Sequence, residues 1–168
     1  MYKILDRQDL APNVHLFKID APEVAKKAQP GQFVIVRIDE KGERIPLTFA
    51  DWDAKAGTVT IVFAEAGATT CRLASLKAGD SIENFVGPLG IPTHIEKYGT
   101  VICVGGGIGV APITPIARGL KQAGNKVISI MGARNKDLLF WENNRRASSE
   151  ELIVCTDYGS YGSKGLVT

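Results

Sequence analysis

The chain has 168 residues, of which 45% are hydrophobic and 23% are charged, and its formal net charge is only +2. This composition is ordinary for a globular protein, and the near balance of charge gives no reason to expect nucleic acid or a membrane as a partner. The first residues contain no hydrophobic stretch typical of a secretion signal, and no apolar run is long enough to cross a membrane, so we expect a cytoplasmic protein.

The first half of the chain has the pattern of short strands separated by turns. Four segments are rich in β-branched and aromatic residues, and turn-forming residues lie between them. The predicted strands are residues 14–19, 33–38, 58–63 and 81–86. Helical character is weak here, with residues 68–76 as the one predicted helical piece. Several short strands at this spacing predict an antiparallel barrel or sandwich over residues 1–97.

The segment Arg44-Ile45-Pro46-Leu47-Thr48 opens a new apolar stretch after a polar turn. Arg44 is a cation that can bind a phosphate through two N–H groups, Pro46 stiffens the backbone, and the Thr48 hydroxyl can donate to a ring nitrogen. An ordinary strand entry with a solvated arginine explains the same residues. The segment by itself therefore leaves both interpretations open.

Two further segments of the first half contain glycines with a possible role in binding. Gly67, Thr69 and Thr70 lie at the start of the predicted helix, where they can bind a phosphate or simply cap the helix. Residues 87–90, Gly-Pro-Leu-Gly, predict a tight turn that closes the barrel, and Gly87 can bring the backbone close to a ligand.

From residue 98 onward, predicted strands and helices alternate. The strands are residues 101–104, 126–131 and 152–156, and the helices are residues 111–123 and 138–147. This alternation predicts βαβ units and a parallel sheet over residues 98–168. Nucleotide-binding sheets of this kind commonly have more strands, with the first strand near the centre. We therefore expect this domain to be incomplete at its C-terminus, with one sheet edge and one apolar face uncovered.

Four glycines, Gly105, Gly106, Gly107 and Gly109, separate the first of these strands from its helix. Backbone without Cβ atoms lets a ligand approach the main chain, and free N–H groups at a helix start attract an anion such as a dinucleotide pyrophosphate. The spacing is not Gly-x-Gly-x-x-Gly, because Val110 stands three residues after Gly107. Tight packing alone explains such a turn equally well.

Asp157 falls at the carboxyl end of the third predicted strand, the edge at which ligands bind in open α/β sheets. A carboxylate there can accept hydrogen bonds from ribose hydroxyls and repels a 2′-phosphate, which favours NAD(H) over NADP. Arg134, at the end of the second predicted strand, is able to bind that phosphate and weakens the preference. Residues 159–162 are predicted to form a loop beside the same edge.

The cysteines and histidines form no pattern typical of a nucleophile or a metal site. Cys71, Cys103 and Cys155 are far apart and odd in number, so we expect three buried, unpaired thiols. His15 and His94 have no acidic or nucleophilic partner at motif spacing, and we expect structural roles for both. If the protein is an enzyme, bound cofactors supply its chemistry.

As a set, these motifs resemble the ferredoxin–NADP reductase superfamily over essentially the whole chain. The resemblance rests on residues 44–48, 67–70, 87–90, 104–112 and 156–157. Within the superfamily, residues 41–48 and 157–168 favour the small (alpha) subunits of NADH-dependent reduced ferredoxin:NADP oxidoreductase, also called sulfide dehydrogenase beta subunits. The electron-transfer subunits of dihydroorotate dehydrogenase are a sibling branch.

The resemblance implies a barrel that binds FAD, with Arg44 near the flavin pyrophosphate and Thr48 near the isoalloxazine ring in a catalytic position. It also implies NAD(H) over the glycine turn, Asp157 at the adenosine ribose, and hydride transfer between nicotinamide and flavin. The implied cofactor-binding residues are Arg44, Pro46, Leu47, Thr48, Gly67, Thr69, Thr70, Gly87, Gly105, Gly106, Gly107, Gly109, Pro112 and Asp157.

Two departures from the family pattern qualify this expectation. Tyr158 stands where the family usually has a second acidic residue. Family members also continue past the equivalent of Thr168 into a cysteine cluster that holds a [2Fe-2S] centre, whose cysteines are not in this chain. We expect an electron-transfer subunit that passes electrons to ferredoxin or to a larger partner subunit. The alternatives are a flavin- or partner-binding fragment without catalysis, or a dihydroorotate dehydrogenase electron-transfer subunit.

Overall fold

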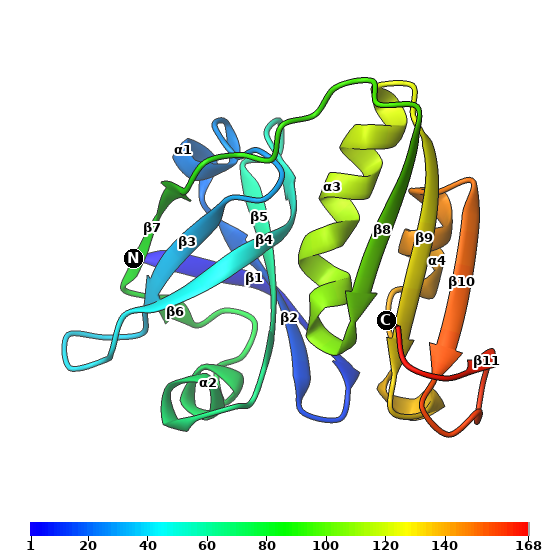
Figure 1. Ribbon diagram of the computed structural model, residues 1–168. Coiled ribbons are helices and arrows are strands. Elements are labelled where there is room, and N and C mark those ends of the chain that lie inside the picture. The colour runs from blue at the N-terminus through cyan, green and yellow to red at the C-terminus, as the bar shows by residue number, and fades with distance from the viewer. Residues whose placement is uncertain (168) are drawn as a thin grey trace. The chain divides into compact units, whose positions relative to one another are not determined.

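The computed structural model describes residues 1–167, and the chain divides into two compact units (Figure 1). The first unit is Met1–Thr93, and the second begins at His94. Strands dominate the first unit, whereas strands and helices alternate in the second. The sequence predicts this change of pattern near residue 97.

The first unit is a seven-stranded antiparallel sheet that curls into a barrel. Its strands are β1 (Tyr2–Ala11), β2 (Val14–Asp20), β3 (Phe33–Arg37), β4 (Ile45–Asp53), β5 (Thr58–Ala64), β6 (Ser81–Ile82) and β7 (Asn84–Leu89). The spatial order is β6-β1-β2-β5-β4-β3-β7, so the two end strands of the sheet are consecutive in the chain and bring its edges back together. Two short helices, α1 (Pro22–Ala25) and α2 (Ala68–Ala74), accompany the sheet. The predicted antiparallel barrel is confirmed.

The interior of the barrel follows the two-residue period of its strands. On β3, Val34 and Val36 are fully buried, while the alternate residues Phe33, Ile35 and Arg37 are half-buried. On β4, Ile45 and Leu47 pack against the core, so that Pro46 and the residue two further on face outward. The largest fully buried side chains of the barrel are Phe17, Phe49, Phe63, Phe85, Ile4, Ile19, Ile61, Leu73, Ile82 and Val34. Each such side chain contributes about 1.5–3 kcal/mol through burial.

Several predictions for the first unit are wrong in detail. β1 and β4 are absent from the predicted strands, because β1 carries charges at its outward positions and β4 contains Pro46. The predicted strand 81–86 is two strands separated by Glu83. The predicted tight turn at 87–90 is also wrong, since its first three residues extend β7 and only Gly90 has the positive φ of a turn (+83°). Cys71 is exposed, because α2 turns Leu73 and not Cys71 toward the core.

The second unit is a parallel sheet with two helices on one face (Figure 1). Its strands are β8 (Thr100–Gly106), β9 (Lys126–Ala133), β10 (Glu151–Thr156) and β11 (Ser163–Lys164), in the spatial order β11-β10-β9-β8. The helices are α3 (Val110–Gln122) and α4 (Glu142–Ala147), and 3-10 turns occupy Gly107–Gly109 and Lys136–Leu138. The predicted parallel α/β arrangement is confirmed.

The two faces of this sheet differ in how they are covered. Cys103, Val127, Ala117 and Leu120 form a core between the sheet and α3. On the other face, the side chains of Ile102, Val104 and Ile153 are 62%, 41% and 38% exposed. Within residues 1–167, β8 pairs with β9 alone, so its other edge carries unpaired backbone groups. An open edge and an uncovered apolar face are both present, as the sequence predicts.

Two predictions for the second unit need correction. The predicted helix 138–147 begins only at Glu142, because the preceding residues form a 3-10 turn and Trp141 has a positive φ of 60°. The Asn135 side chain caps that turn by accepting from the Asp137 N–H at 3.1 Å. The fourth strand, β11, is missing from the prediction, since two residues show no periodicity.

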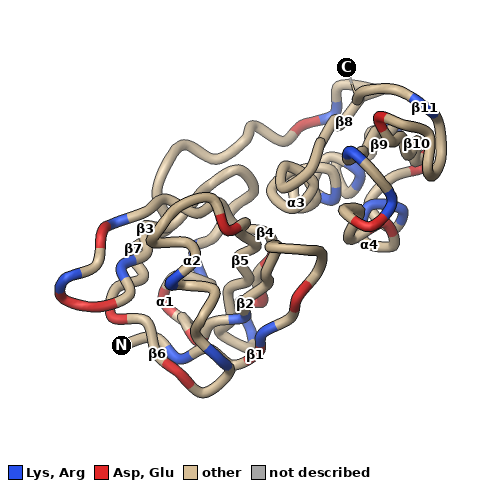
Figure 2. Tube along the Cα trace, turned by 90° about the horizontal axis from the view of Figure 1, so that it is seen from below, with Lys and Arg blue, Asp and Glu red and all other residues tan. Residues whose placement is uncertain are grey.

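Lysines and arginines alternate with aspartates and glutamates along both units, in agreement with the balanced composition (Figure 2). Up to Val167, no helix is both long and apolar enough to cross a bilayer. Nor do the described residues contain a group of three or more His, Cys, Asp or Glu side chains arranged to hold a metal ion.

Candidate functional site

The glycine turn connects the end of β8 to the start of α3. β8 runs through Gly106, so Gly105 and Gly106 belong to the strand, and Gly107–Gly109 alone form the turn. Gly107 has a positive φ of 53°, a conformation that favours glycine. The chain therefore reverses direction within three residues before the helix begins.

The glycines of this region have two different functions. A Cβ on Gly105 would lie 2.9 Å from Ile113 Cγ2 and 3.0 Å from the Gly109 carbonyl oxygen, so Gly105 permits close packing of α3 on β8. A Cβ on Gly107 or Gly109 would meet nothing within 4 Å. The absence of side chains at Gly107 and Gly109 thus leaves an open cradle of backbone, while at Gly105 it serves packing.

The start of α3 carries backbone donors without a side-chain cap. Gly109 is the N-cap residue and has no side chain that could accept from the first N–H groups of the helix. The Val110 N–H donates to the Gly107 carbonyl of the preceding 3-10 turn, and Pro112 has no N–H. The dipole of this 13-residue helix favours an anion beside the cradle.

The carboxyl ends of β8, β9 and β10 meet at one edge of the sheet. The strand register pairs Gly106 with Gly132 on β9, and Ala133 with Thr156 on β10. Asp157 follows directly, and its N–H donates to the Ala133 carbonyl at 3.2 Å. Its half-buried carboxylate makes no hydrogen bond or ion pair with the described residues. The glycine turn and a carboxylate without a partner therefore share one edge, separated by β9.

A pocket of about 460 Å³ lies among the loops that follow β9 and β10. Its walls are Lys136, residues 139–144 and Tyr161. Lys136 Nζ lies 5.4 Å from the centre of the Tyr161 ring, and the Tyr161 hydroxyl is 3.1 Å from Glu142 Oε2. Trp141 forms another part of the wall. Aromatic rings, a cation and a carboxylate together suit a flat ring that carries polar groups.

Arg145 joins the elements on either side of the glycine turn. Its side chain is fully buried, and Nη2 donates to the Cys103 carbonyl at 3.0 Å and to Ser129 Oγ at 2.7 Å. Nη1 donates to the Ile113 carbonyl at 3.3 Å. Burial lowers the pKa of Arg145 and raises that of the Cys103 thiol, which remains neutral. Because Cys103 is on β8 and Ile113 is near the start of α3, the Arg145 side chain holds β8 and α3 together.

The outward face of the barrel at β4 brings the first group of predicted residues together. Thr48 is half-buried and lies opposite Phe33, and Pro46 lies opposite Ile35 on β3. These four side chains share the outer face, because Val34 and Val36 point inward. Leu47 packs against the core, so only its backbone is available to a ligand.

The second group of predicted residues lies around α2. Thr70 Oγ1 accepts from the N–H groups of Ala66 and Gly67 at 2.9 and 3.0 Å, and it donates to the Gly67 carbonyl at 3.0 Å. Thr69 Oγ1 donates to Glu43 Oε2 at 2.7 Å. Since Glu43 immediately precedes Arg44, this contact brings the first and second groups of predicted residues into one region.

Gly87 is on β7, beside β3, in a packing position. A Cβ there would lie 2.7 Å from Val34 Cγ1 and 3.1 Å from the Phe33 carbonyl oxygen. The close approach of β7 to β3 is therefore sufficient reason for this glycine.

His15 differs most from its expectation. The sequence shows no acidic partner for it at motif spacing, yet its ring nitrogens lie 2.6 Å from Asp9 Oδ1 and 2.7 Å from Glu65 Oε1. Asp9 is its direct cross-strand neighbour in the β1–β2 hairpin. The partner was missed because β1 was not predicted as a strand. His94 is exposed and contacts Tyr98.

Other residues of the candidate sites were missed by sequence reasoning. Phe33 and Ile35 lie on the outer face beside Thr48. The sequence does indicate an apolar outer face here, since residues 33–36 are apolar on both faces of the strand. Lys136, Trp141 and Tyr161 line the pocket. They carry no motif, because the pocket forms only when the loops after two different strands come together.

Comparison with known proteins gives relatives over nearly the whole chain, although no family model matches it. A protein of Clostridium beijerinckii described only as uncharacterized, in the adh 3′ region, is 48% identical over 98% of the chain. A Thermotoga maritima protein described as a homologue of the electron transfer subunit of dihydroorotate dehydrogenase B (NAD(+)) is 48% identical over 99%. The chain spans 58% of the length of each of these relatives.

A solved structure agrees with this relationship. The structure of NADH-dependent reduced ferredoxin-NADP oxidoreductase, described in work on flavin-based electron bifurcation, superposes with a TM-score of 0.95 at 46% identity. The match covers 99% of this chain and 60% of that chain. The shared features are an antiparallel barrel followed by a parallel sheet with helices on one face. By sequence and by fold, the chain is similar to proteins of the ferredoxin–NADP reductase superfamily.

Proposed function

We propose that this chain is the nucleotide-binding part of an electron-transfer subunit, in which the barrel binds FAD and the parallel sheet binds NAD(H). The observation that carries the proposal is the pairing, at one sheet edge, of an open glycine cradle with the partner-free carboxylate of Asp157. The names of two relatives support it, since one is the homologue of an NAD(+)-linked electron transfer subunit and the other is an NADH-dependent oxidoreductase.

In the proposed NAD(H) site, each part of the dinucleotide has a matching group. The pyrophosphate lies over Gly107 and Gly109, beside the positive end of the α3 dipole. The Asp157 carboxylate accepts from the hydroxyls of the adenosine ribose. The adenine ring enters the pocket between Trp141 and Tyr161.

In the proposed FAD site, the outer face of β3 and β4 receives the isoalloxazine ring. Phe33, Ile35 and Pro46 offer a flat apolar surface, and the Thr48 hydroxyl donates to the ring. Arg44 and Thr69 bind the diphosphate. Thr69 donates its one hydroxyl hydrogen to Glu43, so it exchanges that carboxylate for the diphosphate when FAD binds. A Cβ on Gly67 would meet nothing within 4 Å, which leaves space beside that hydroxyl.

When both cofactors are bound, they supply hydride transfer between nicotinamide and flavin. The residues of this chain bind and orient them, and Thr48 is the side chain proposed to contact the reacting ring. The proposed acceptor of the electrons is ferredoxin or a larger partner subunit. A dihydroorotate dehydrogenase partner fits the Thermotoga relative equally well.

The test is reconstitution of the purified chain with FAD, followed by anaerobic titration with NADH. We expect a yellow protein whose flavin absorbance bleaches with NADH and much less readily with NADPH. A protein that retains no flavin overturns the proposal. Clear preference for NADPH overturns the assignment of Asp157 while leaving the flavin site intact.

A second candidate function is a flavin- or partner-binding subunit without catalysis of its own. The exposed apolar residues Ile102, Val104 and Ile153 on one face of the sheet favour it, because an exposed apolar patch suits a protein partner. Yellow protein that NADH leaves oxidised supports this candidate over the first.

A further inference from the structure

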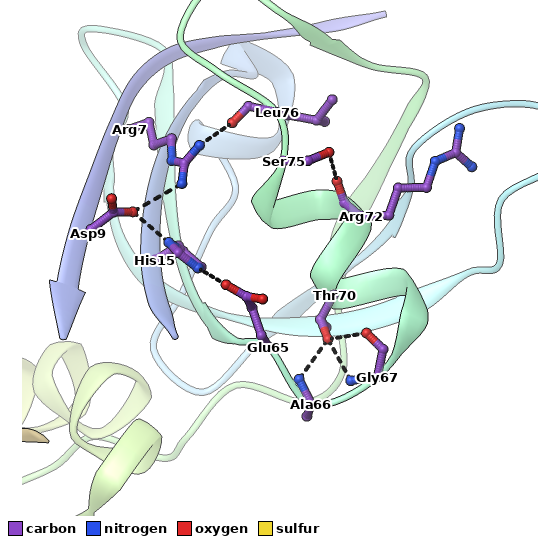
Figure 3. Close-up of polar contacts among 10 residues, drawn as sticks. All are labelled: Arg7, Asp9, His15, Glu65, Ala66, Gly67, Thr70, Arg72, Ser75 and Leu76. Carbon is purple, nitrogen blue, oxygen red and sulfur yellow. Dashed lines mark hydrogen bonds and ion pairs between the residues drawn. The ribbon is translucent and has the colours of Figure 1, made fainter. Parts of the chain in front are cut away.

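Four charged side chains of alternating sign form a row on the barrel next to α2 (Figure 3). Arg7 and Asp9 come from β1, His15 from β2, and Glu65 from the residue after β5. Arg7 Nη2 donates to Asp9 Oδ1 at 3.2 Å, and the same oxygen lies 2.6 Å from His15 Nδ1. His15 Nε2 lies 2.7 Å from Glu65 Oε1. The row therefore continues without a gap from β1 to the chain leading into α2.

The geometry of His15 requires a charged ring. An ionised carboxylate only accepts hydrogen bonds, and each nitrogen of His15 faces a carboxylate oxygen. The hydrogen bond from His15 is the main cause that lowers the pKa of Asp9, whose side chain is 66% exposed, so Asp9 is ionised at neutral pH. A neutral imidazole has one donor and serves one of these carboxylates, whereas the imidazolium serves both.

His15 is also the buried member of the row. Its side chain is 8% exposed, against 30% for Glu65. The ring of Phe63 packs beside it, with ring centres 5.6 Å apart. Partial exclusion of water strengthens the hydrogen bond to Glu65 and holds it in one geometry.

Glu65 leads directly into the turn that carries the proposed diphosphate-binding residues. Its N–H donates to the Asn13 carbonyl at 2.9 Å, and its side chain is bound by His15. The N–H groups of the next two residues, Ala66 and Gly67, both donate to the hydroxyl of Thr70 (Figure 3). The turn is thus closed by Thr70 and attached to the β1–β2 hairpin through Glu65.

The far end of the same segment is attached to the same hairpin. Arg7 Nη1 donates to the carbonyl of Leu76, two residues after the end of α2, at 3.0 Å. The row from Arg7 to Glu65 therefore holds α2 at both of its ends (Figure 3).

We infer that His15 is a positioning residue of the flavin site: its imidazolium binds Glu65 and thereby holds the turn at 66–70 in the form that receives the flavin diphosphate. The inference rests on the proposed function. It follows that FAD binding weakens when the ring of His15, with its two donors, is replaced. The charged groups that face His15 are Asp9 and Glu65, with Arg7 beyond Asp9, and Phe63 of β5 does not titrate.

The experiment compares three variants of the full chain with the wild type: His15→Gln, Glu65→Gln and the control His94→Gln. The dissociation constant of FAD is measured by flavin fluorescence at neutral pH. We expect His15→Gln to bind FAD about tenfold more weakly, the size of one charge-assisted hydrogen bond, because glutamine has only one donating group for the two carboxylates. Glu65→Gln also binds more weakly, and His94→Gln matches the wild type.

Hydrogen exchange gives a second readout that needs no flavin. In His15→Gln at neutral pH, the amides of Ala66 and Gly67 exchange faster than in the wild type, while those of β4 are unchanged. Equal exchange at these amides overturns the inference, as does FAD binding by His15→Gln with wild-type affinity. If the wild-type chain binds no FAD, both the proposed function and the role of His15 are overturned. If the wild-type chain binds FAD and His15→Gln behaves like it, only the role of His15 is overturned.

Discussion

Asp157 is the residue on which the choice of nicotinamide nucleotide depends in the proposed site. We expect Asp157→Asn to weaken NADH binding by about tenfold or more, since a hydrogen bond to a charged group contributes about 1.5–3 kcal/mol. The same change removes the repulsion of a 2′-phosphate, so NADPH binding improves. Titration of the FAD-loaded chain with each nucleotide measures both effects. Glu151→Gln, at the opposite end of the same strand, is the control and leaves both affinities unchanged.

Asp9 makes the stability of the barrel depend on pH in the acid range. The hydrogen bond from His15 lowers its pKa below the ordinary value of 3.8, so its contribution to stability is present above that value. This contribution is lost as the pH falls through the lowered pKa. We expect Asp9→Asn to reduce stability at neutral pH and to flatten the acid limb of a stability curve measured by urea unfolding. A variant with the wild-type acid limb contradicts the assignment.

At the scale of single residues, the sequence predicts what depends on local chain geometry. The glycines of the turn and Asp157 follow predicted strands directly, and they lie at the sheet edge where the sequence predicts them. His15 could not be understood in this way, because its partners are 6 and 50 residues away and meet it only through strand pairing. Tyr161 in the pocket wall was missed for the same reason.

At the scale of elements, Gly105 and Gly109 have different roles in the connection from β8 to α3. Gly105 allows close packing, and Gly109 belongs to the proposed binding surface. Gly105→Ala places a Cβ against Ile113 and the Gly109 carbonyl, so we expect it to destabilise the second unit by about 1–3 kcal/mol. Gly109→Ala meets open space and has a helical φ of −62°, so its stability should remain within about 0.5 kcal/mol of wild type. If the cradle binds NAD(H), Gly109→Ala nevertheless weakens NADH binding.

Thermal unfolding and NADH titration of the two glycine variants provide the measurement. A Gly109→Ala variant with unchanged stability and unchanged NADH affinity shows that the cradle is not a binding surface. A Gly105→Ala variant as stable as wild type shows that α3 can move away from β8 at little cost.

Helix α4 contributes to this unit through one buried side chain. Arg145→Met removes three hydrogen bonds, to the carbonyls of Cys103 and Ile113 and to Ser129 Oγ, each of which contributes about 0.5–1.5 kcal/mol. We expect a loss of roughly 3 kcal/mol in the free energy of unfolding of the second unit. Arg146→Met is the matched control. Arg146 is exposed and pairs with Glu142 on the surface of the same helix, so its change costs less than about 1 kcal/mol.

Urea unfolding followed by the circular dichroism of each variant tests this expectation. Equal stability of the Arg145 and Arg146 variants would show that the buried guanidinium contributes no more than a surface pair.

The elements also show where periodicity is a sufficient guide. The predicted α3 and the strands 101–104, 126–131 and 152–156 agree with the structure to within two residues, because long apolar patterns determine them. β1 and β4 were missed because their pairing partners, not their own composition, make them strands. The start of α4 depends on the backbone of Trp141, which no propensity predicts.

At the scale of the whole molecule, each of the two units has its own core. We therefore expect two unfolding transitions in calorimetry, with the lower one belonging to the second unit, whose sheet has an uncovered face. FAD at about 100 times its dissociation constant should stabilise the first unit alone, by about 2.7 kcal/mol. Arg145→Met should move only the other transition. A single transition that shifts with changes in either unit contradicts this picture.

The strand orders of the two sheets have a consequence for how the protein is made. In the second unit the spatial order β8, β9, β10, β11 is also the chain order, so a chain leaving the ribosome can add each strand to the edge of the one before it. The barrel has no such growth order, since β1 waits for β6 and β3 waits for β7 before its ladders are complete. During synthesis, the glycine turn therefore acquires its neighbours almost as soon as it emerges. The barrel of the first unit instead stays incomplete until its last strand, β7, which ends at Leu89, has left the ribosome.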